Sequence, residues 1–432
     1  MIGSGGREHA LCWALRKDAR RLSRLYCAPG NAGIAEIAQC VPISATDTGA
    51  LARFAEEEKI NLTIVGSEAP LAAGLADEFA GRGLIVAGPR CAAAELEASK
   101  VFAKEFMARH HVPTARYRVA RSAMEAREIL RCGEFGPEGS PVVIKADGLA
   151  AGKGVTVAGS RAEAERAVVE LVEQGQVGRE AARRIVIEEA LAGREASLLL
   201  FTDGRDYKLM PAARDHKRVG ENDTGPNTGG MGAVTAPCVL DEQTAARVVR
   251  EVVEPTLEGI RREQFDFRGV LYVGLMLTPE GPRVLEYNVR FGDPEAQAIL
   301  VRLESDLAEV FEAVARRNLG QLRVEWTDDA SACVVLAARG YPGRPETGAR
   351  IEGLGAARHL PNVQIFHAGT SAAPDGSFLT AGGRVLGVTA VGATLDEALG
   401  HGYEAVGRIH WDGMHYRRDI GKFPEKTESS KK

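Results

Sequence analysis

One segment constrains both the fold and the chemistry of this chain: residues 284–295, with the sequence VLEYNVRFGDPE. The pattern predicts a strand, along which side chains alternate between faces, so Glu286, Asn288 and Arg290 are expected on one face. Carboxylate and amide oxygens are hard ligands that suit Mg²⁺, and a guanidinium beside them suits a phosphate. We therefore expect a metal–nucleotide to meet an anion here, although an amphipathic strand with a solvated face fits the same pattern. The opposite face would carry Leu285, Tyr287 and Val289.

The composition is that of a soluble globular enzyme with several domains. The chain has 432 residues, of which 45% are hydrophobic and 26% charged, so two to four domains are expected. The formal net charge is −5 and no block of Lys and Arg exceeds a helix face, so nucleic-acid binding is not expected. The apolar runs are too short to span a membrane. No charged leader precedes an apolar stretch, so no signal peptide is expected.

The cysteines and histidines show no ligand spacing. The seven cysteines include no C-x-x-C pair, which favours reduced thiols in a cytoplasm over a disulfide framework or a zinc site. The nine histidines are likewise expected on the surface or in packing. We therefore expect a cytoplasmic protein without a zinc site.

Residues 1 to about 97 alternate short apolar strands with helical patterns. Segments 61–66 and 83–88 are predicted as buried strands that end in glycine turns, and a helix is predicted between them at 70–80. This is the βαβ rhythm of a parallel sheet. Such sheets bind ligands at the carboxyl ends of their strands, where the turns 3–6 and 67–70 lie.

The rest of the chain divides into a mixed middle block and a strand-rich C-terminal block, with no internal repeat. A long helix is predicted at 92–110, and a polar tail at 426–432 is expected to be disordered. The middle block has predicted strands at 142–146, 154–158, 185–189, 196–202, 269–277 and 283–290, and helices at 161–174, 241–262 and 304–317. The C-terminal block has predicted strands at 332–338, 363–367, 384–391 and 414–418, and a helix at 395–408.

A glycine-rich turn precedes the first predicted helix, at residues 9–16. Gly3, Gly5 and Gly6 before a helix N-terminus expose backbone N–H groups to an anion. The pattern is not a dinucleotide fingerprint, because Glu8 stands where the third glycine would be. A phosphate-bearing substrate therefore fits better than NAD, and the alternative is a plain tight turn.

A second glycine-rich cluster lies at 141–155, with the sequence PVVIKADGLAAGKGV. Lys145 ends an apolar strand, where a buried ammonium needs an anion. The loop that carries Gly152 and Lys153 is close to a P-loop, but one spacer residue is missing and Gly154 replaces the Ser/Thr that would hold Mg²⁺. Because the residues that follow are β-forming, we predict a glycine hairpin that folds over phosphates; the alternative is a surface hairpin.

Two further segments bring polar side chains to the expected nucleotide site. Strand 185–189 ends in Glu188 and Glu189; beside a phosphate-binding hairpin such a segment can bind adenine, while a solvated sheet edge is the alternative. The glycine-rich loop 215–232 is long and charged, as is typical of functional loops. We expect a mobile loop that closes on substrate, with a plain solvent loop as the alternative.

Together these segments resemble the glycinamide ribonucleotide synthetase (phosphoribosylamine–glycine ligase) family of the ATP-grasp superfamily. The resemblance covers nearly the whole chain, and the order and joint presence of its motifs make it specific. The motifs are residues 3–11, 28–33, 68–71, 145–155, 215–232, 286–295, 366–370, 382–386 and 417–421.

Two departures from the family pattern stand out. The family has several more residues before Ile2, so the first strand is expected to be short or frayed, or the chain to begin upstream of Met1. Ser67 stands where the family commonly has Pro, which should change the stiffness of the loop more than its chemistry.

The resemblance implies a multidomain protein of α/β and α+β class. Residues 1–97 would form an N-terminal Rossmann-like (pre-ATP-grasp) domain, residues 98–318 an ATP-grasp body with a small lid at about 114–184, and residues 319–425 a C-terminal β-rich domain. The implied reaction joins glycine to 5-phosphoribosylamine through a glycyl phosphate, giving glycinamide ribonucleotide, ADP and phosphate in purine synthesis. ATP and Mg²⁺ or Mn²⁺ are the implied cofactors. A monomer is expected that binds neither nucleic acid nor membrane.

The resemblance also implies roles for individual residues. The metal ligands would be Glu286 and Asn288, and the catalytic groups Arg290, Asp215 and Lys217. The nucleotide would be held by Lys100, Lys145, Gly152, Lys153, Glu188, Glu189, Leu191 and Glu195. The substrates would be bound by Gly5, Gly6, Arg7, Asn31, Glu68 and Asp293. Two alternatives remain: another ATP-grasp carboxylate–amine ligase, and a nucleotide-binding regulator without turnover.

Overall fold

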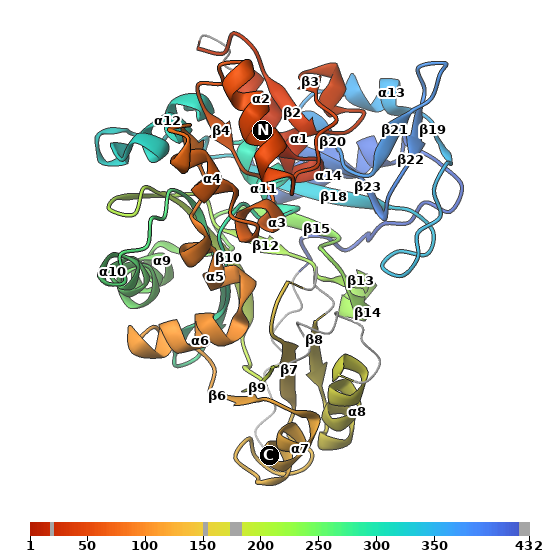
Figure 1. The fold of residues 1–432 in the computed structure, drawn as a ribbon. Coiled ribbons are helices and arrows are strands. Elements are labelled where there is room, and N and C mark those ends of the chain that lie inside the picture. The colour runs from red at the N-terminus through yellow and green to blue at the C-terminus, as the bar shows by residue number, and fades with distance from the viewer. Residues whose placement is uncertain (18–20, 150–153, 173–183, 423–432) are drawn as a thin grey trace.

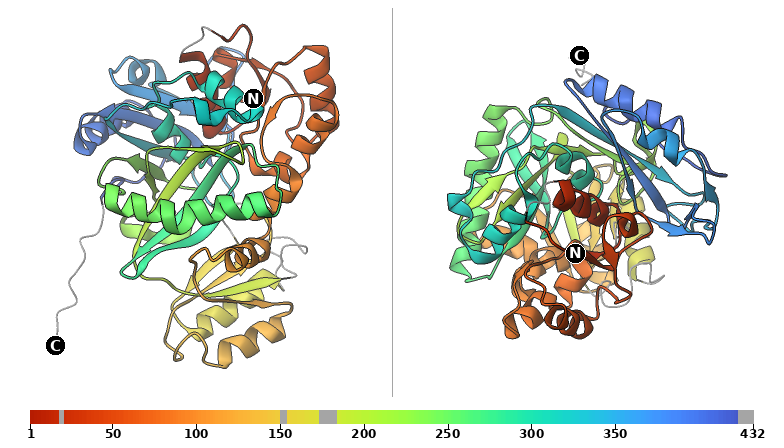
Figure 2. Two further views of the ribbon diagram at one scale, coloured as in Figure 1. Left: turned by 90° about the vertical axis from the view of Figure 1, so that its left-hand side faces the viewer. Right: turned by 90° about the horizontal axis from the view of Figure 1, so that it is seen from above.

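The computed structural model describes residues 1–17, 21–149, 154–172 and 184–422. Gly152, Lys153 and the tail 426–432 therefore lie outside the described residues. Mixed sheets and helices build a body from which one lobe projects (Figures 1 and 2), and the expected α/β and α+β multidomain class is confirmed. All seven cysteines are free thiols. No helix of the described residues is long and apolar enough to cross a membrane.

The N-terminal part is a parallel sheet flanked by helices. Its strands pair in parallel from β1 to β2 and from β2 to β3, and a bridge between Ile2 and Val65 adds the parallel pair β4–β5. The resulting order β3-β2-β1-β4-β5 is that of a Rossmann-like fold. As expected, β1 is short. The strands are β1 (Ile2–Gly3), β2 (Tyr26–Pro29), β3 (Gln39–Cys40), β4 (Thr63–Ile64) and β5 (Val86–Ala87).

The helix predicted at 70–80 is two helices, because Gly74 interrupts it. Gly74 has φ +81°, in the left-handed region that glycine enters without steric cost. The prediction of one continuous helix was therefore wrong. The helices of this part are α1 (Gly6–Lys17), η1 (Ile34–Glu36), α2 (Thr48–Glu57), α3 (Glu68–Ala72) and α4 (Leu75–Gly81).

The helix predicted at 92–110 is also split, into α5 (Cys91–Ala98) and α6 (Lys100–Arg109). Ser99 between them is extended, and its Oγ accepts a hydrogen bond from the N–H of Phe102 at 3.0 Å, so α6 has its own N-cap. The same Oγ donates to Asp147 at 2.9 Å. The break thus ties α6 to the projecting lobe.

The projecting lobe, called the lid below, is a four-stranded antiparallel sheet with two helices. It is the gold and yellow part at the foot of Figure 1 and of the left view in Figure 2. Leu130, Ile144 and Val168 belong to its own small core. The strand order is β6-β9-β7-β8. The elements are β6 (Tyr117–Ala120), α7 (Ala123–Arg131), β7 (Val142–Ala146), β8 (Val155–Ala158), α8 (Arg161–Val172) and β9 (Ile185–Glu189).

One nine-stranded sheet joins the middle block to the C-terminal block. Its order is β17-β16-β10-β12-β15-β18-β23-β20, with β11 beside β10. The junction is the antiparallel pair β15–β18, in which Ala233 lies opposite Cys333. The middle strands are β10 (Arg194–Thr202), β11 (Tyr207–Leu209), β12 (Ala213–Asp215), β15 (Gly232–Thr235), β16 (Gly269–Thr278) and β17 (Gly281–Asn288). The C-terminal strands are β18 (Ala330–Ala337), β20 (Val363–His367) and β23 (Arg384–Gly392).

Helices and short hairpins complete the body. The helix predicted at 241–262 is α9 (Glu242–Val248) and α10 (Glu254–Arg262), joined by a π-helical turn at Val249–Val253. The strand predicted at 414–418 is wrong, since only a bridge from His415 to Ala337 forms there. The other helices are α11 (Glu295–Leu300), α12 (Leu307–Arg316), α13 (Leu354–Arg358), α14 (Leu395–Val406), η3 (Glu221–Asp223) and η5 (Leu319–Gln321). The short strands are β13 (Arg218–Gly220), β14 (Thr224–Asn227), β19 (Arg350–Ile351), β21 (Thr370–Ala372) and β22 (Phe378–Thr380).

Candidate active site

A polar pocket lies where the lid, helices α5 and α6, and strand β17 meet. The lid contributes Lys145, Gly148 and Glu188 to its walls. Helices α5 and α6 contribute Glu97, Lys100 and Lys104. The start of α3 contributes Glu68. From β17 and the turn after it come Leu285, Glu286, Tyr287, Asn288 and Arg290. The pocket thus gathers charged side chains from four separate parts of the chain.

Glu286 and Asn288 both face this pocket, as the strand pattern predicts. Removal from water would raise the pKa of Glu286, but Lys217, Lys145 and Lys100 together lower it, so the carboxylate is held ionised. The Oδ1 of Asn288 accepts a hydrogen bond from Arg290 at 3.2 Å, which leaves its second lone pair available. An ionised carboxylate and an amide oxygen form a donor set that fits Mg²⁺ or Mn²⁺.

The strict alternation expected along this strand is wrong at Leu285. The register between β16 and β17 shifts there, since Leu275 pairs with Val284 and Gly274 with Glu286, which leaves Leu285 as an extra residue. Leu285 therefore lines the pocket, and its carbonyl accepts a hydrogen bond from Lys145 at 3.0 Å. Tyr287 and Val289 are buried, and Tyr287 is also among the residues that line the pocket.

Arg290 follows the end of β17 and forms ion pairs with two carboxylates. Its guanidinium lies 2.6 Å from Glu97 and 3.3 Å from Glu68. Burial opposes a charge here, but Glu97 and Glu68 raise the pKa of Arg290 above its usual value, so the group stays cationic. Glu68 also lies 3.7 Å from Arg7, which extends this group of ion pairs to the first turn of α1.

The lysines of the pocket are held by specific acceptors. Lys100 donates to the carbonyl of Gly148 at 2.8 Å. Lys145 and Lys104 share the buried carboxylate of Glu188, at 2.9 Å and 3.1 Å. Burial lowers the pKa of Lys104 to about 8, although Glu188 favours its charged form. The Glu188 carboxylate is thus the shared counter-charge of two lysine side chains.

Only one of the two acids at the end of β9 enters the pocket. Glu189 points to the other face, where it lies 2.7 Å from the exposed Arg116. This follows from the alternation of side chains along a strand. Leu191 and Glu195 are not among the lining residues, and Glu195 instead lies 3.3 Å from Lys217.

The placement of Glu188 predicts an unequal effect of two matched substitutions. We expect Glu188→Gln to lower the free energy of unfolding by about 3 kcal/mol, because two buried ammonium groups lose their shared counter-charge. Glu189→Gln removes the same charge from an exposed pair and should change stability little. Denaturant unfolding measures both. Equal losses in the two variants would contradict this account of the lid.

Asp215 and Lys217 lie at the end of β12, beside Glu286. Lys217 is 3.8 Å from Glu286. Burial raises the pKa of Asp215 to about 7; Lys217 lowers it, and Glu295, Glu195 and Glu286 raise it further. Asp215 therefore titrates near neutral pH, beside the oxygens suited to a metal.

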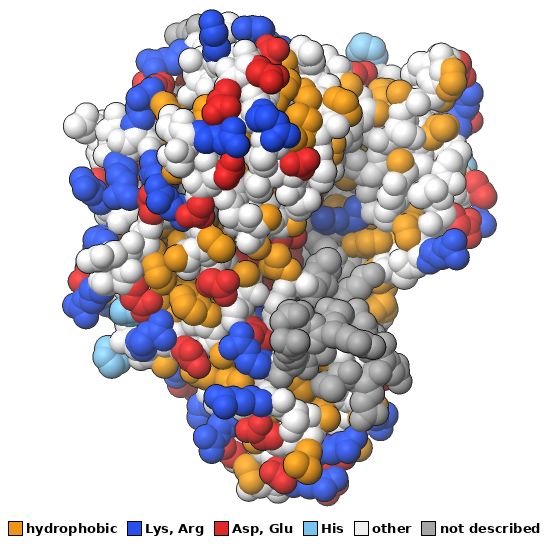
Figure 3. All heavy atoms as spheres, viewed as in Figure 1, with side chains coloured by type: hydrophobic (Ala, Val, Ile, Leu, Met, Phe, Trp, Pro, Cys, Tyr) orange, Lys and Arg blue, Asp and Glu red, His pale blue; other side chains and the backbone are white. Residues whose placement is uncertain are grey.

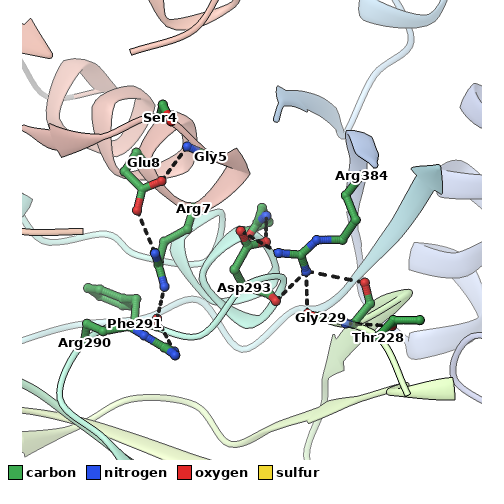
Figure 4. Close-up of polar contacts among 12 residues, drawn as sticks. Ser4, Gly5, Arg7, Glu8, Thr228, Gly229, Arg290, Phe291, Asp293 and Arg384 are labelled. Atoms are coloured by element: carbon green, nitrogen blue, oxygen red, sulfur yellow. Dashed lines mark hydrogen bonds and ion pairs between the residues drawn. The ribbon is translucent and has the colours of Figure 1, made fainter. Parts of the chain in front are cut away.

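A second polar recess adjoins the pocket at the N-terminal turn. Figure 3 shows Lys or Arg side chains in the hollow between the N-terminal and C-terminal parts. Arg7 is buried and donates to the carbonyl of Phe291 at 3.0 Å. Arg384 reaches from β23 to Asp293, with Nη2 3.1 Å from Oδ2, and its guanidinium also contacts the carbonyl of Gly229 (Figure 4).

The side chain of Glu8 fills the space beside the glycine turn. The N–H of Gly5 donates to Glu8 at 2.6 Å, and Glu8 also accepts from Arg7 at 2.7 Å (Figure 4). A Cβ at Gly3 or Gly66 would lie within 2.5 Å of the Glu8 side chain. These glycines therefore make room for a helix-capping carboxylate, and the Gly5 N–H already has a partner.

Asn31 bridges the N-terminal and C-terminal parts. Its amide nitrogen donates to the carbonyls of Ser4 and His367, both at 2.8 Å. Its oxygen accepts from the N–H groups of Gly33 and Ile34. All four hydrogen-bonding positions of the side chain are thus filled, which makes Asn31 a structural link in this conformation.

Three charged residues of the site are missed by the sequence reasoning. Glu97 and Lys104 lie on helices whose other buried residues are apolar. A charged residue among the apolar positions of such a helix is unusual, and this pattern could have identified both as candidate site residues. Arg384 follows two glycines in one of the family-like motifs but had no predicted role. Its contact with Asp293 joins residues 91 positions apart and has no local pattern.

The small antiparallel lid, whose Lys145 lies in one pocket with Glu286 and Asn288 of β17, fits the ATP-grasp class, and this chain is an ATP-dependent ligase of that class. Three family descriptions match it in order. They are phosphoribosylglycinamide synthetase N domain (residues 1–97), ATP-grasp (A) domain (residues 98–296) and C domain (residues 331–423). The chain belongs to the phosphoribosylglycinamide synthetase family, so the resemblance drawn from its motifs is confirmed.

Individual relatives agree with the family. Phosphoribosylamine–glycine ligase of Xylella fastidiosa (strain Temecula1) is 47% identical over 425 residues, or 98% of this chain and 96% of its own. The same-named protein of Brucella melitensis is 46% identical over 421 residues, with 98% and 96% covered. A crystal structure of phosphoribosylamine–glycine ligase from Thermotoga maritima superposes with a TM-score of 0.82 at 35% identity, covering 97% of this chain and 98% of that one.

Proposed function

We propose that this chain joins glycine to 5-phosphoribosylamine in the purine pathway, with the site residues in the roles given below. The observation that carries the proposal is one pocket in which Glu286, Asn288 and Arg290 meet Lys100 and Lys145. Next to it, the recess of Arg7, Asp293 and Arg384 offers charged groups for a phosphorylated sugar. The two relatives named phosphoribosylamine–glycine ligase align with almost the whole of this chain.

The first step activates the glycine carboxylate. The γ-phosphoryl group moves from ATP to a carboxylate oxygen, forming a P–O bond as the bond to ADP breaks. The product is glycyl phosphate, in which phosphate is a far better leaving group than oxide. Lys100 and Lys145 hold the nucleotide phosphates, and Arg290 faces the transferred phosphoryl group, so the protein acts by positioning and charge stabilisation.

A divalent ion would be held by Glu286 and Asn288 and would neutralise charge on the triphosphate. The ionised state of Glu286 and the open lone pair of Asn288 support this assignment. Mg²⁺ and Mn²⁺ both prefer such oxygen ligands.

The second step forms the amide. The amine nitrogen of phosphoribosylamine attacks the carbonyl carbon, the C–O bond to phosphate breaks, and the nitrogen loses a proton. Ionised Asp215 accepts this proton, and Lys217 beside it stabilises the departing phosphate. The lid keeps water away from glycyl phosphate, which would otherwise hydrolyse.

The position of Asp215 predicts a pH dependence. Its carboxyl is neutral below a pKa of about 7 and becomes an effective base above it, so kcat should rise as the pH increases through 7. In Asp215→Asn this acidic limb should disappear and the rate should be low at every pH. Steady-state rates between pH 5.5 and 9 test this. An unchanged acidic limb in the variant would remove Asp215 from the proton transfer.

The reaction itself is tested by coupled ADP release. ADP should appear only when glycine and freshly generated phosphoribosylamine are both present, and Lys217→Met should abolish that turnover while it still binds MgADP. ADP release that needs a different acid or amine would identify another ATP-grasp carboxylate–amine ligase. Nucleotide binding without turnover under all of these conditions would indicate a regulator.

A further inference from the structure

The loop 215–232 is folded and tethered, whereas its sequence predicts a mobile segment. It forms the hairpin β13–β14, which lies below β15 in Figure 1. At the tip of the hairpin, Asn222 and Asp223 have φ of 55° and 54°. Asn and Asp are the residues with side chains that most readily adopt this left-handed conformation, as the turns of hairpins require. The tip is also held from outside the hairpin, by hydrogen bonds to Asn222 and Asp223.

The stabilising contact comes from Arg417, near the end of the described chain. This side chain is buried, and Nη1 donates to Asp223 at 2.8 Å and to the carbonyl of Arg218 at 3.1 Å. Its other nitrogens donate to both oxygens of Asp419, at 2.8 Å and 2.7 Å. Asp419 in turn accepts the N–H of Asn222 at 2.8 Å. The pair Arg417–Asp419 thus holds both the base and the tip of the hairpin.

The same C-terminal segment contacts the hairpin at a second point and is itself fixed. The N–H of Gly421 donates to His216 Nε2 at 3.2 Å, and His216 lies between Asp215 and Lys217 in sequence. Tyr403 of α14 anchors the segment, because its hydroxyl donates to the carbonyl of Arg417 at 2.9 Å and accepts the N–H of Ile420 at 3.1 Å. The segment that holds the hairpin is therefore fixed to the C-terminal block.

Lys217 lies at the centre of these contacts. Its carbonyl accepts hydrogen bonds from the N–H and the hydroxyl of Thr228, at 2.8 Å and 2.9 Å, across the hairpin. Its ammonium lies between Glu195 and Glu286. Arg417 and Asp419 do not line the pocket. Arg417 contacts the backbone next to Lys217, at the carbonyl of Arg218, and Lys217 in turn lies 3.8 Å from the pocket residue Glu286.

From this geometry we propose that Arg417 and Asp419 are positioning residues of the reaction. They fix the hairpin so that the ammonium of Lys217 faces Glu286 and the group that reacts there. The proposal rests on the function proposed above for Lys217. It assigns a task to the C-terminal motif 417–421, which the catalytic scheme does not otherwise use. A misplacement of about 1 Å is enough to cost up to a hundredfold in rate.

The test compares two variants that loosen this contact from opposite sides. Asp223→Ala removes the partner on the hairpin, where the side chain is half exposed and folding is not at risk. Arg417→Lys keeps the charge but cannot make the forked contacts of a guanidinium. We expect each to lower kcat by about tenfold or more, with the Kd for MgADP unchanged within twofold. The double variant should be no slower than the slower single one, because both break one contact.

The control is Arg408→Lys, which changes an exposed arginine of the same block that is paired with Glu404. It should keep the full kcat. A merely structural role of Arg417 would lower the melting temperature without changing kcat per folded molecule, and that result would overturn the proposal. Lys217→Met separates the positioning proposal from the proposed role of Lys217 in the reaction. If Lys217→Met is inactive while Asp223→Ala is fully active, only the positioning proposal is overturned. If Lys217→Met is itself fully active, the proposed role of Lys217 is overturned.

Discussion

Glu286→Ala is expected to lower kcat at least about a hundredfold, because it removes the one ionised oxygen ligand in the proposed metal pair. The matched control is Glu280→Ala, which removes the same charge from the exposed turn between β16 and β17. That variant should retain the full rate. Steady-state rates are measured over a range of Mg²⁺ concentrations. Near-normal turnover of Glu286→Ala at saturating Mg²⁺ would contradict the ligand assignment.

Arg290→Met is expected to lose both activity and stability. Activity falls because the cation that faces the transferred phosphoryl group is gone, a loss of about a hundredfold or more in kcat. Stability falls by about 3–5 kcal/mol because Glu97 is left buried without its partner. Rates and denaturant unfolding of the same preparation measure the two effects.

A second substitution separates these two effects of Arg290. Adding Glu97→Gln to Arg290→Met removes the unpaired charge, so the double variant should regain most of the lost stability. It should not regain activity, since the phosphoryl-binding cation is still absent. Recovery of both would mean that Arg290 serves the fold alone.

Whereas β6 was not predicted, local patterns in the sequence were sufficient for the other three of the four strands of the lid, β7, β8 and β9, and for β17. Each of these is a short apolar run bounded by turn residues, so its period and ends are visible locally. Breaks inside elements were harder to predict. Ser99 is a good N-cap residue and Gly74 a common helix breaker, but both lie in otherwise continuous helical patterns. The bulge at Leu285 depends on the register with β16, which the segment itself does not specify.

The candidate site was predictable where one segment carries its residues and not where distant segments meet. Glu286 and Asn288 share a strand, so their common face followed from alternation. The partners of Arg290 come from α5 and from the start of α3, 193 and 222 residues away along the chain. The contacts of Arg290 are set by packing between separate parts of the fold. The glycine turn is a different case, because Glu8 stands three residues after Gly5, a local capping pattern that was not recognised in the sequence.

The central claim is that one divalent ion is bound by Glu286 and Asn288 beside the nucleotide phosphates. The most direct measurement is an anomalous-difference map from crystals grown with MnADP, collected on either side of the manganese absorption edge. The account predicts a manganese peak at ordinary coordination distance, about 2.0–2.4 Å, from the Glu286 carboxylate and from Asn288 Oδ1. A bound nucleotide with its manganese peak away from both side chains would contradict it.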